Sequence, residues 1–213
     1  LSVRYSMPEW IVQEWLMAYG KEQTKAILDA FSKEAPLTIR TNVTKITPEA
    51  LKEQLEAEGV MVQTLEELGY DGLPDTDVYH YAFAISGFDH LMALPSFRDG
   101  LFYVQDISSM MVAEAAAPGK GAHVIDVCAA PGGKSIHLAE KLAGTGSVET
   151  RDLTEYKTGL IEENISRYRI KNMTTKVWDA TIPDESAKGT ADVLIADLPC
   201  SGLGVLRKKT DIR

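Results

Sequence analysis

Hydrophobic positions in the second half of the chain form short apolar runs that alternate with segments of helical spacing. Four such runs, typical of buried strands, lie at 123–128, 147–150, 175–178 and 192–196. The segment after the first run places Ile136, Ala139 and Leu142 on one face of a helix. Strands alternating with helices at this spacing predict a parallel sheet with right-handed crossovers. The predicted fold class is α/β, with ligands beyond the carboxyl ends of the strands.

The first hundred residues show a different order, in which helices precede and separate short strands. Two helices that divide at Gly20 are predicted before an alternating strand at 37–41. A further helix between Thr47 and Gly59 precedes a strand at 60–62. This order is typical of a small α+β unit that ends near residue 100.

Charge is distributed unevenly between the two predicted domains, at 1–100 and 101–213. The chain of 213 residues holds 22 Lys and Arg against 31 Asp and Glu, a net charge of −9. The first domain has 8 basic and 16 acidic side chains, and the second has 14 and 15. An acidic protein is not an obvious nucleic-acid binder, because phosphate contacts normally need a basic footprint.

The sequence also limits compartment and metal chemistry. No apolar stretch approaches the roughly 18 residues of a spanning helix. No basic segment followed by an apolar one comes after Leu1, so we expect no secretory leader. The two cysteines, Cys128 and Cys200, cannot build a disulfide framework, so we expect a cytoplasmic protein. The four histidines show no ligand spacing with either cysteine, so no metal site is expected.

The first predicted strand ends in a glycine-rich turn, Asp-Val-Cys-Ala-Ala-Pro-Gly-Gly-Lys, at 126–134. Gly132 and Gly133 lack a Cβ atom, so a ligand can approach the backbone closely. The helix that follows offers free N–H groups and a positive dipole end. A plain glycine turn would explain the glycines but not Lys134 at its mouth, which favours a binding site.

Further polar residues follow the other strands. Asp152 ends the second predicted strand, where a carboxylate can accept both hydroxyl groups of a ribose. Asp179 follows the third strand, and the fourth leads into Asp-Leu-Pro-Cys-Ser-Gly at 197–202. Pro199 stiffens this loop, from which Asp197 and Cys200 project. A cysteine at a strand end near cations is a candidate thiolate.

Two of these motifs, at 126–135 and 197–202, resemble the hallmarks of the bacterial 16S rRNA cytosine-C5 methyltransferases, which include the Sun/Fmu proteins and have eukaryotic NOL/NOP2/Sun relatives. The segments at 37–42 and 104–109 are similar to that family's N-terminal motifs, so the resemblance spans nearly the whole chain. It implies a Rossmann-like core that uses S-adenosylmethionine, after a small α+β N-terminal subdomain that binds RNA.

The resemblance also implies roles for individual residues. Asp152 would hold the ribose of the methyl donor, Asp179 would lie by its adenine, and Asp197 would contact the donor or the target base. The residues expected to cradle the donor are Cys128, Ala129, Ala130, Pro131, Gly132, Gly133 and Lys134.

Cytosine C5 chemistry requires a thiolate that adds to C6 and a base that removes the C5 proton. The residues alone favour Cys200 as this nucleophile, with Asp197 and Lys134 beside it. The resembled family instead uses a cysteine of a Thr-Cys motif one strand further on, and its Pro-Cys thiol takes part in product release. That motif is absent here, so we expect a C-terminally incomplete sheet, in a fragment that binds the donor but turns over poorly.

RNA contact, which must overcome the acidic net charge, is expected to be local. We predict that it involves Arg40, Arg207, Lys208 and Lys209, with ribosomal RNA as the partner. Three alternatives remain open at this point: a P-loop-like NTPase, a noncatalytic RNA-binding scaffold, and a transfer RNA cytosine-C5 methyltransferase. The NTPase is disfavoured because its phosphate loop needs glycine where Cys128 stands, and Pro131 removes an N–H group.

Overall fold

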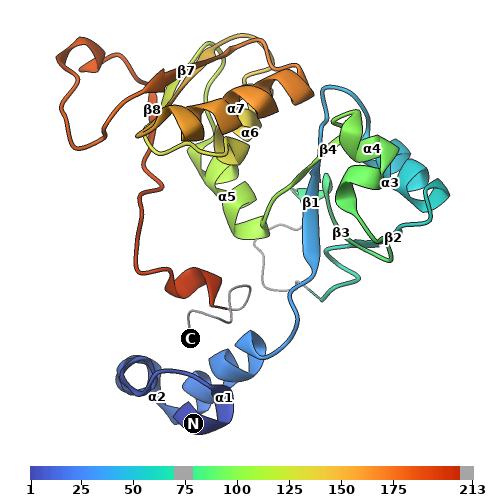
Figure 1. The fold of residues 1–213 in the computed structure, drawn as a ribbon, viewed down its shortest axis with the longest axis vertical. Helices are drawn as coiled ribbons and strands as arrows, with labels where there is room; N and C mark the ends of the chain where they lie inside the picture. Colours follow the sequence, from blue (N-terminus) through green and yellow to red (C-terminus); the bar gives the residue numbers. More distant parts are fainter. Residues whose placement is uncertain (70–78, 207–213) are drawn as a thin grey trace. The chain divides into compact units, whose positions relative to one another are not determined.

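The computed structural model describes residues 1–69 and 79–206 (Figure 1). Contacts within the chain divide it into two compact units. One unit comprises Leu1–Pro36 together with Pro199–Arg213, and the other comprises Leu37–Leu198. None of the described helices is long and apolar enough to cross a membrane.

The smaller unit is built on helices. It contains α1 (Ser2–Tyr5), α2 (Glu9–Phe31) and the short 3-10 helix η4 (Leu203–Val205). Gly20 interrupts α2 with φ 73° and ψ 174°, a left-handed φ that glycine adopts without a Cβ clash. The predicted division of this region into two helices at Gly20 is therefore confirmed. Leu28 is fully buried in the apolar cluster of this unit, which also includes Leu206.

The larger unit begins with an antiparallel sheet in the strand order β2-β3-β1-β4. The strands are β1 (Leu37–Thr41), β2 (Met61–Thr64), β3 (Ala82–Ser86) and β4 (Phe102–Val104). β1 lies in the middle, with Ile39 opposite Phe83 on one side and Val104 on the other. Two of these strands, β3 and β4, are additions to the predicted pattern.

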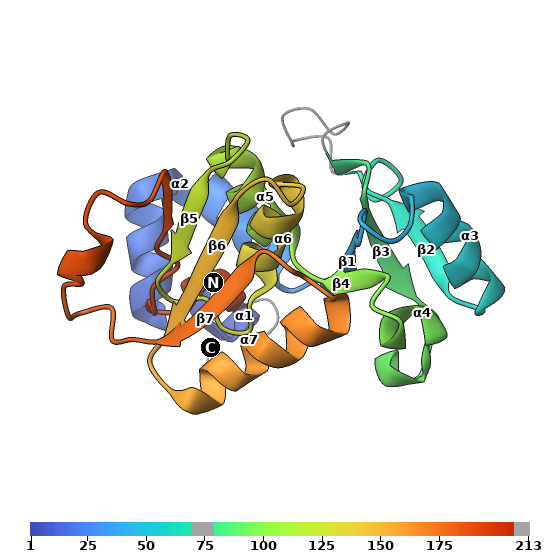
Figure 2. The same ribbon diagram turned by 90° about the horizontal axis from the view of Figure 1, so that it is seen from above.

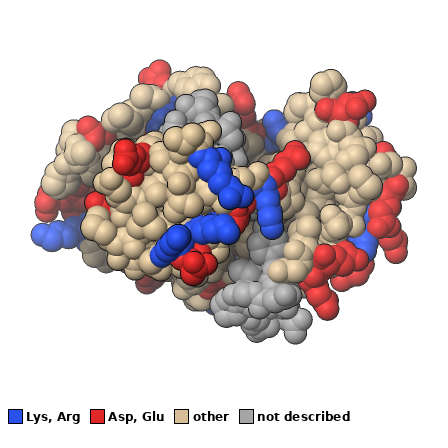
Figure 3. All heavy atoms as spheres, turned by 90° about the horizontal axis from the view of Figure 1, so that it is seen from below, with Lys and Arg blue, Asp and Glu red and all other residues tan. Residues whose placement is uncertain are grey.

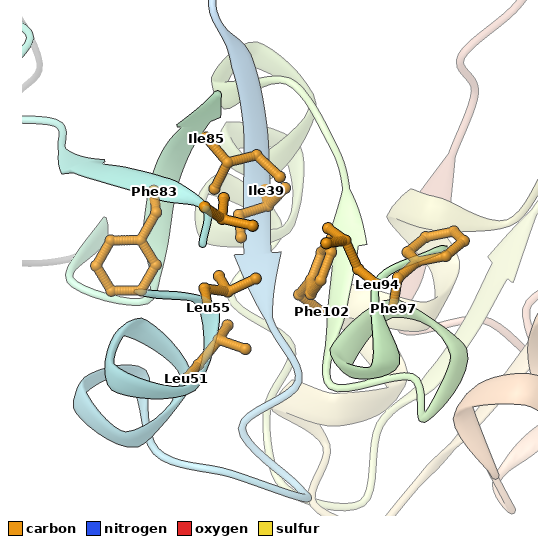
Figure 4. Close-up of a cluster of buried hydrophobic side chains, with 9 residues drawn as sticks. Ile39, Leu51, Leu55, Phe83, Ile85, Leu94, Phe97 and Phe102 are labelled. Atoms are coloured by element: carbon orange, nitrogen blue, oxygen red, sulfur yellow. The ribbon is translucent and has the colours of Figure 1, made fainter. Parts of the chain in front are cut away.

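Helices cover one face of this sheet and close its core. They are α3 (Pro48–Ala57), the 3-10 helix η2 (Leu91–Ala93) and α4 (Pro95–Arg98). The Thr47 side chain accepts a hydrogen bond from the Ala50 N–H group and so caps α3. Figure 4 shows Leu51 and Leu55 of α3 directed toward Ile39 of β1 in the apolar cluster of this sheet.

A parallel sheet follows, in the strand order β7-β6-β5-β8. Its strands are β5 (His123–Asp126), β6 (Ser147–Asp152), β7 (Met173–Val177) and β8 (Val193–Ile195). All three neighbouring pairs are parallel, as the alternation of strands and helices predicts. The four predicted strands and the α/β fold class are thus confirmed.

Three helices pack on the parallel sheet: α5 (Ile107–Ala116), α6 (Gly133–Lys141) and α7 (Glu155–Tyr168). Buried side chains of α5 and α6 form an apolar cluster with Val124, Val148 and Ile195. α7 packs on β6 and β7, along which it runs in Figure 2. A short 3-10 helix, η3 (Glu185–Ala187), lies between β7 and β8.

The predicted boundary near residue 100 differs from the way the chain pairs. β4 lies after residue 100 but belongs to the antiparallel sheet, through pairing with β1. The helices of Leu1–Pro36 form a unit with the segment that starts at Pro199. The domain boundaries at 1–100 and 101–213 therefore stay a prediction, and they differ from the two units into which the chain packs.

Candidate functional site

The glycine-rich turn lies between β5 and α6, at the carboxyl end of the parallel sheet. Gly132 has φ 103°, and a Cβ atom there would stand 3.3 Å from Cγ2 of Ile161 on α7. A side chain would thus be strained by the backbone and crowded by α7. Gly132 is the N-cap of α6 and provides no side-chain cap, so the first N–H groups of α6 are left for an anionic ligand.

Asp126 fixes the start of this turn, which we call the donor loop (128–133). Its carboxylate accepts hydrogen bonds from the Cys128 N–H group at 3.3 Å and from the Ser135 hydroxyl at 2.5 Å. Burial raises the pKa of Asp126, and these two hydrogen bonds oppose that effect. One side chain therefore joins the end of β5 to both the donor loop and α6.

α7 holds the middle of the donor loop. The Asn164 side chain donates a hydrogen bond to the Pro131 carbonyl oxygen at 2.9 Å. Pro131 has no N–H group, so its carbonyl oxygen is the only backbone atom of this residue that can form a hydrogen bond. The loop is thus supported by β5 and α7 before any ligand binds.

Asp152, at the end of β6, holds the donor loop from the neighbouring strand. Its side chain is 3% exposed and accepts hydrogen bonds from the N–H groups of Ala130 at 3.0 Å and Leu153 at 2.8 Å. The Lys157 ammonium lies 3.1 Å from the same carboxylate. Burial acts to raise the pKa of Asp152, but these hydrogen bonds and Lys157 outweigh it, so the pKa lies below its usual range.

Lys134 and Asp197 form an ion pair that joins the start of α6 to the end of β8. The Lys134 Nζ atom lies 2.5 Å from an Asp197 carboxylate oxygen, and their side chains are 22% and 58% exposed. Cys128 is partly buried, and burial together with the carboxylates of Asp152 and Asp126 raises the pKa of its thiol. Cys128 is therefore a neutral thiol near neutral pH, consistent with a structural part of the loop.

Asp179 and Cys200 occupy different settings. The Asp179 carboxylate accepts hydrogen bonds from the Thr181 hydroxyl and N–H group, which hold its pKa below the usual range. It follows β7 at the same end of the sheet as Asp152. Cys200 is exposed and belongs to the unit that contains Leu1–Pro36. Its role beside the donor loop therefore stays a prediction.

The predicted RNA contacts receive one correction. Arg40 is 1% exposed, because its guanidinium forms a buried ion pair with Glu140 and a hydrogen bond with Gln105. A side chain without accessible surface cannot contact RNA phosphates, so the prediction for Arg40 is wrong. The other three predicted contacts, Arg207, Lys208 and Lys209, lie outside the described residues.

His137, in the middle of α6, is a buried neutral histidine. Its Nε2 atom lies 3.5 Å from Glu114, whose carboxylate already accepts hydrogen bonds from Tyr81 and Lys141. Burial, with Arg40 and Lys141 nearby, lowers the pKa of His137 to about 2.

This depressed pKa predicts acid sensitivity. Below pH 6.5 the unfolded chain protonates His137 while the folded chain does not, so the unfolded state binds more protons and stability falls. The expected loss of unfolding free energy is about 1.4 kcal/mol per pH unit below that point. Urea denaturation of the chain and of His137→Gln from pH 7.5 to 4.5 measures it. Parallel pH profiles for the two proteins would contradict the prediction.

Several residues at the site escaped the sequence reasoning. Ser135 is the last residue of the motif at 126–135. Its hydrogen bond to Asp126 could have been expected, because the two residues flank one turn. Asn164 carries no such signal, because a polar residue on a helix is usually solvated. Glu140 was concealed for the same reason, as its partner Arg40 is 100 positions away.

The hydrogen-bonding groups of the site suit a nucleoside that carries a charged amino-acid tail. Free N–H groups at the start of α6 suit a carboxylate. Gly133 has room at the position of a Cβ atom, whereas at Gly132 that position faces Ile161 of α7. The Lys134–Asp197 pair lies beside them at the start of α6. Among the described residues, no group of three or more His, Cys, Asp or Glu side chains is placed to hold a metal ion.

Comparison with known proteins finds matches along most of the chain. Residues 113–213 match the family described as 16S rRNA methyltransferase RsmB/F. Residues 7–73 match the family described as the ferredoxin-like domain of RsmF/B-like methyltransferases.

Curated relatives and a solved structure agree with these matches. A Bacillus subtilis protein described as a probable ribosomal RNA small subunit methyltransferase B is 36% identical, over 100% of this chain and 45% of its own length. Its Escherichia coli O127:H6 counterpart is 32% identical, over 99% of this chain and 46% of its own length. The structure of NSun6 from Pyrococcus horikoshii with SFG superposes with a TM-score of 0.77 at 23% identity, over 94% of this chain and 73% of its own, which shows a shared fold. The chain spans less than half the length of these curated relatives.

Proposed function

Because this chain belongs to the RsmB/F family of 16S rRNA methyltransferases, we propose that the protein transfers a methyl group from S-adenosylmethionine to C5 of a cytosine in small-subunit ribosomal RNA. The single observation that carries the proposal is the donor loop, fixed at the carboxyl end of a parallel sheet by Asp126, Asp152 and Asn164. Sites at this place in α/β folds bind nucleotides and related cofactors.

The donor supplies an electrophilic methyl group on its sulfonium centre. In the proposed complex the N–H groups at the start of α6 would hold the carboxylate of the amino-acid part, and Asp152 would accept the ribose hydroxyls. Asp179, beyond the next strand, would lie by the adenine. Asp152 binds as a carboxylate at neutral pH, because its pKa is lowered.

On the target base, a cysteine thiolate adds to C6 and forms a carbon–sulfur bond. The π electrons of the C5=C6 bond move onto C5, which makes the base enamine-like. C5 then attacks the methyl carbon while the methyl–sulfur bond of the donor breaks and S-adenosylhomocysteine leaves. A base then removes the C5 proton, and the thiolate leaves as the C5=C6 bond reforms. In this proposal the nucleophile belongs to the family's Thr-Cys motif one strand further on, and Cys200 of the Pro-Cys pair takes part in product release. Lys134 and Asp197 form their ion pair beside the donor loop.

RNA is the proposed partner, and the relatives' names favour ribosomal over transfer RNA. On the face drawn in Figure 3, basic side chains lie among acidic ones. Such a pattern fits local contacts rather than one broad basic field. Because Arg40 is buried, the proposed contacts are those at 207–209.

Calorimetric titration of the 213-residue chain with S-adenosylmethionine and S-adenosylhomocysteine tests donor binding, with ATP and Mg²⁺ as the matched ligand. We expect both nucleosides to bind and ATP to leave the heat unchanged. Binding of ATP alone would favour an NTPase and refute the proposal. Incubation of the protein with methyl-labelled donor and 16S ribosomal RNA, followed by mapping of 5-methylcytosine, tests the acceptor. Label on transfer RNA alone would refute the ribosomal assignment.

A further inference from the structure

A buried polar group joins the antiparallel sheet to the helix that follows the donor loop. Arg40 of β1 pairs with Glu140 of α6, and both side chains are 1% exposed. The Tyr103 hydroxyl of β4 donates a hydrogen bond to Glu140 at 2.6 Å, and the Arg40 guanidinium lies 4.1 Å from the centre of the Tyr103 ring. These contacts cross between the two sheets, within the unit Leu37–Leu198.

Gln105 extends this group toward the donor loop. Its Oε1 atom accepts a hydrogen bond from Arg40 Nε at 2.7 Å, so the two ends of the carboxamide are distinguished. Its backbone is tied to β1 as well, because the Gln105 N–H group donates to Thr38 and the Thr38 hydroxyl donates back to the Gln105 carbonyl. Gln105 is therefore fixed at both backbone and side chain by β1.

The other end of the carboxamide faces the donor loop. A Cβ atom placed on Gly133 would stand 3.9 Å from Gln105 Nε2. This Nε2 atom is buried and has no hydrogen-bond partner among the described residues, as is also true of Arg40 Nη2. A buried N–H group without a hydrogen-bond partner lowers stability. Such a group beside the start of α6 therefore calls for an explanation other than stability.

Stability alone does not account for such a group. Removing two charges from water costs about as much free energy as their attraction returns. Apolar side chains of similar size would therefore hold the antiparallel sheet against α6 equally well. What the polar group adds is direction, since the planar guanidinium fixes both Glu140 and the Gln105 amide in one arrangement.

We propose that Gln105 is a positioning residue for the donor loop, and that the buried Arg40–Glu140 pair acts on the loop through it. The antiparallel sheet then determines the position of the start of α6. That position determines how well the Gly133 N–H group can bind the methyl donor. This inference rests on the proposed function, because its consequence is donor affinity.

The test is a double-mutant cycle with S-adenosylhomocysteine as the probe, in the 213-residue chain. Gln105→Met keeps length and burial but removes the amide. Arg40→Lys keeps a cation for Glu140 but loses the planar hydrogen bond to Gln105. Each is expected to weaken binding about tenfold, because the start of α6 is then less well placed to meet the probe. The double variant is expected to be no weaker than either single variant, because Arg40 acts through Gln105.

Tyr81→Phe is the matched control. It removes a part-buried hydrogen bond to Glu114 of α5 at 2.6 Å, at another place where the residues around the antiparallel sheet meet the helices of the parallel sheet. We expect it to lower the melting temperature and leave the affinity unchanged. If Arg40→Lys does not fold, Glu140→Gln replaces it in the cycle, since it removes the charge that holds Arg40.

Unchanged affinity in Gln105→Met would overturn the inference, as would additive losses in the double variant. An affinity loss in Tyr81→Phe as large as that in Gln105→Met would also overturn it, because general loosening of the junction would then suffice. If the unaltered chain shows no binding, the proposed function itself is refuted, and the inference with it.

Discussion

Replacing Asp152 with alanine is expected to weaken binding of S-adenosylhomocysteine by about a hundredfold, the equivalent of two hydrogen bonds to a charged group. The carboxylate has two tasks in the proposed complex. It would accept the ribose hydroxyls, and it already holds the Ala130 N–H group of the donor loop at 3.0 Å. Its low pKa keeps it charged throughout the neutral range. Calorimetry on the 213-residue chain measures the loss.

Asp184→Asn is the matched control for this variant. Asp184 is another well-bonded carboxylate, 3.0 Å from Arg151 Nη2 and 3.1 Å from Lys176 Nζ. Arg151 directly precedes Asp152 in β6, so the two side chains lie on opposite faces of the sheet. Asp184→Asn should lower stability and leave donor affinity unchanged. Equal affinity losses in the two variants would contradict the role given to Asp152.

Phe102→Ala is expected to lower the free energy of unfolding by about 3–5 kcal/mol. Phe102 is completely buried in the core of the antiparallel sheet, where its ring centre lies 5.5 Å from that of Phe97 (Figure 4). Removal of the ring leaves a cavity between β4 and α4 that the surrounding backbone cannot close. Urea denaturation followed by circular dichroism gives the change.

Met61→Ala serves as the comparison, since Met61 lies on β2 of the same sheet but is 61% exposed. Its effect should stay within about 0.5 kcal/mol, as is usual for surface positions. A loss for Phe102→Ala below about 1 kcal/mol would mean that the core of the antiparallel sheet contributes little to the measured transition.

The parallel sheet could be predicted from the sequence, whereas half of the antiparallel sheet could not. The runs that became β5 to β8 are short, apolar and separated by helical spacing, so local pattern and tertiary structure agree. β3 is buried over four consecutive residues, and β4 has three residues, so neither shows the alternation of a half-buried strand. Their partners, in β1 and β2, are far away in sequence.

The donor loop could be predicted for a different reason, since glycine, proline and charged residues at a strand end have few other uses. Arg40 shows where such reasoning fails. An arginine on a strand is solvated by default, and only the position of Glu140, on a helix of the other sheet, makes its burial possible. Charge counted along a chain does not tell which charges face solvent.

The supports of the donor loop have a kinetic consequence. Asp126, Asp152 and Asn164 restrain its backbone in the unliganded chain, so little conformational entropy remains to be lost when a ligand arrives. Encounter rather than rearrangement then governs how fast the complex forms. Association should follow a single exponential whose rate rises linearly with ligand concentration, without the plateau that a slow closing step imposes.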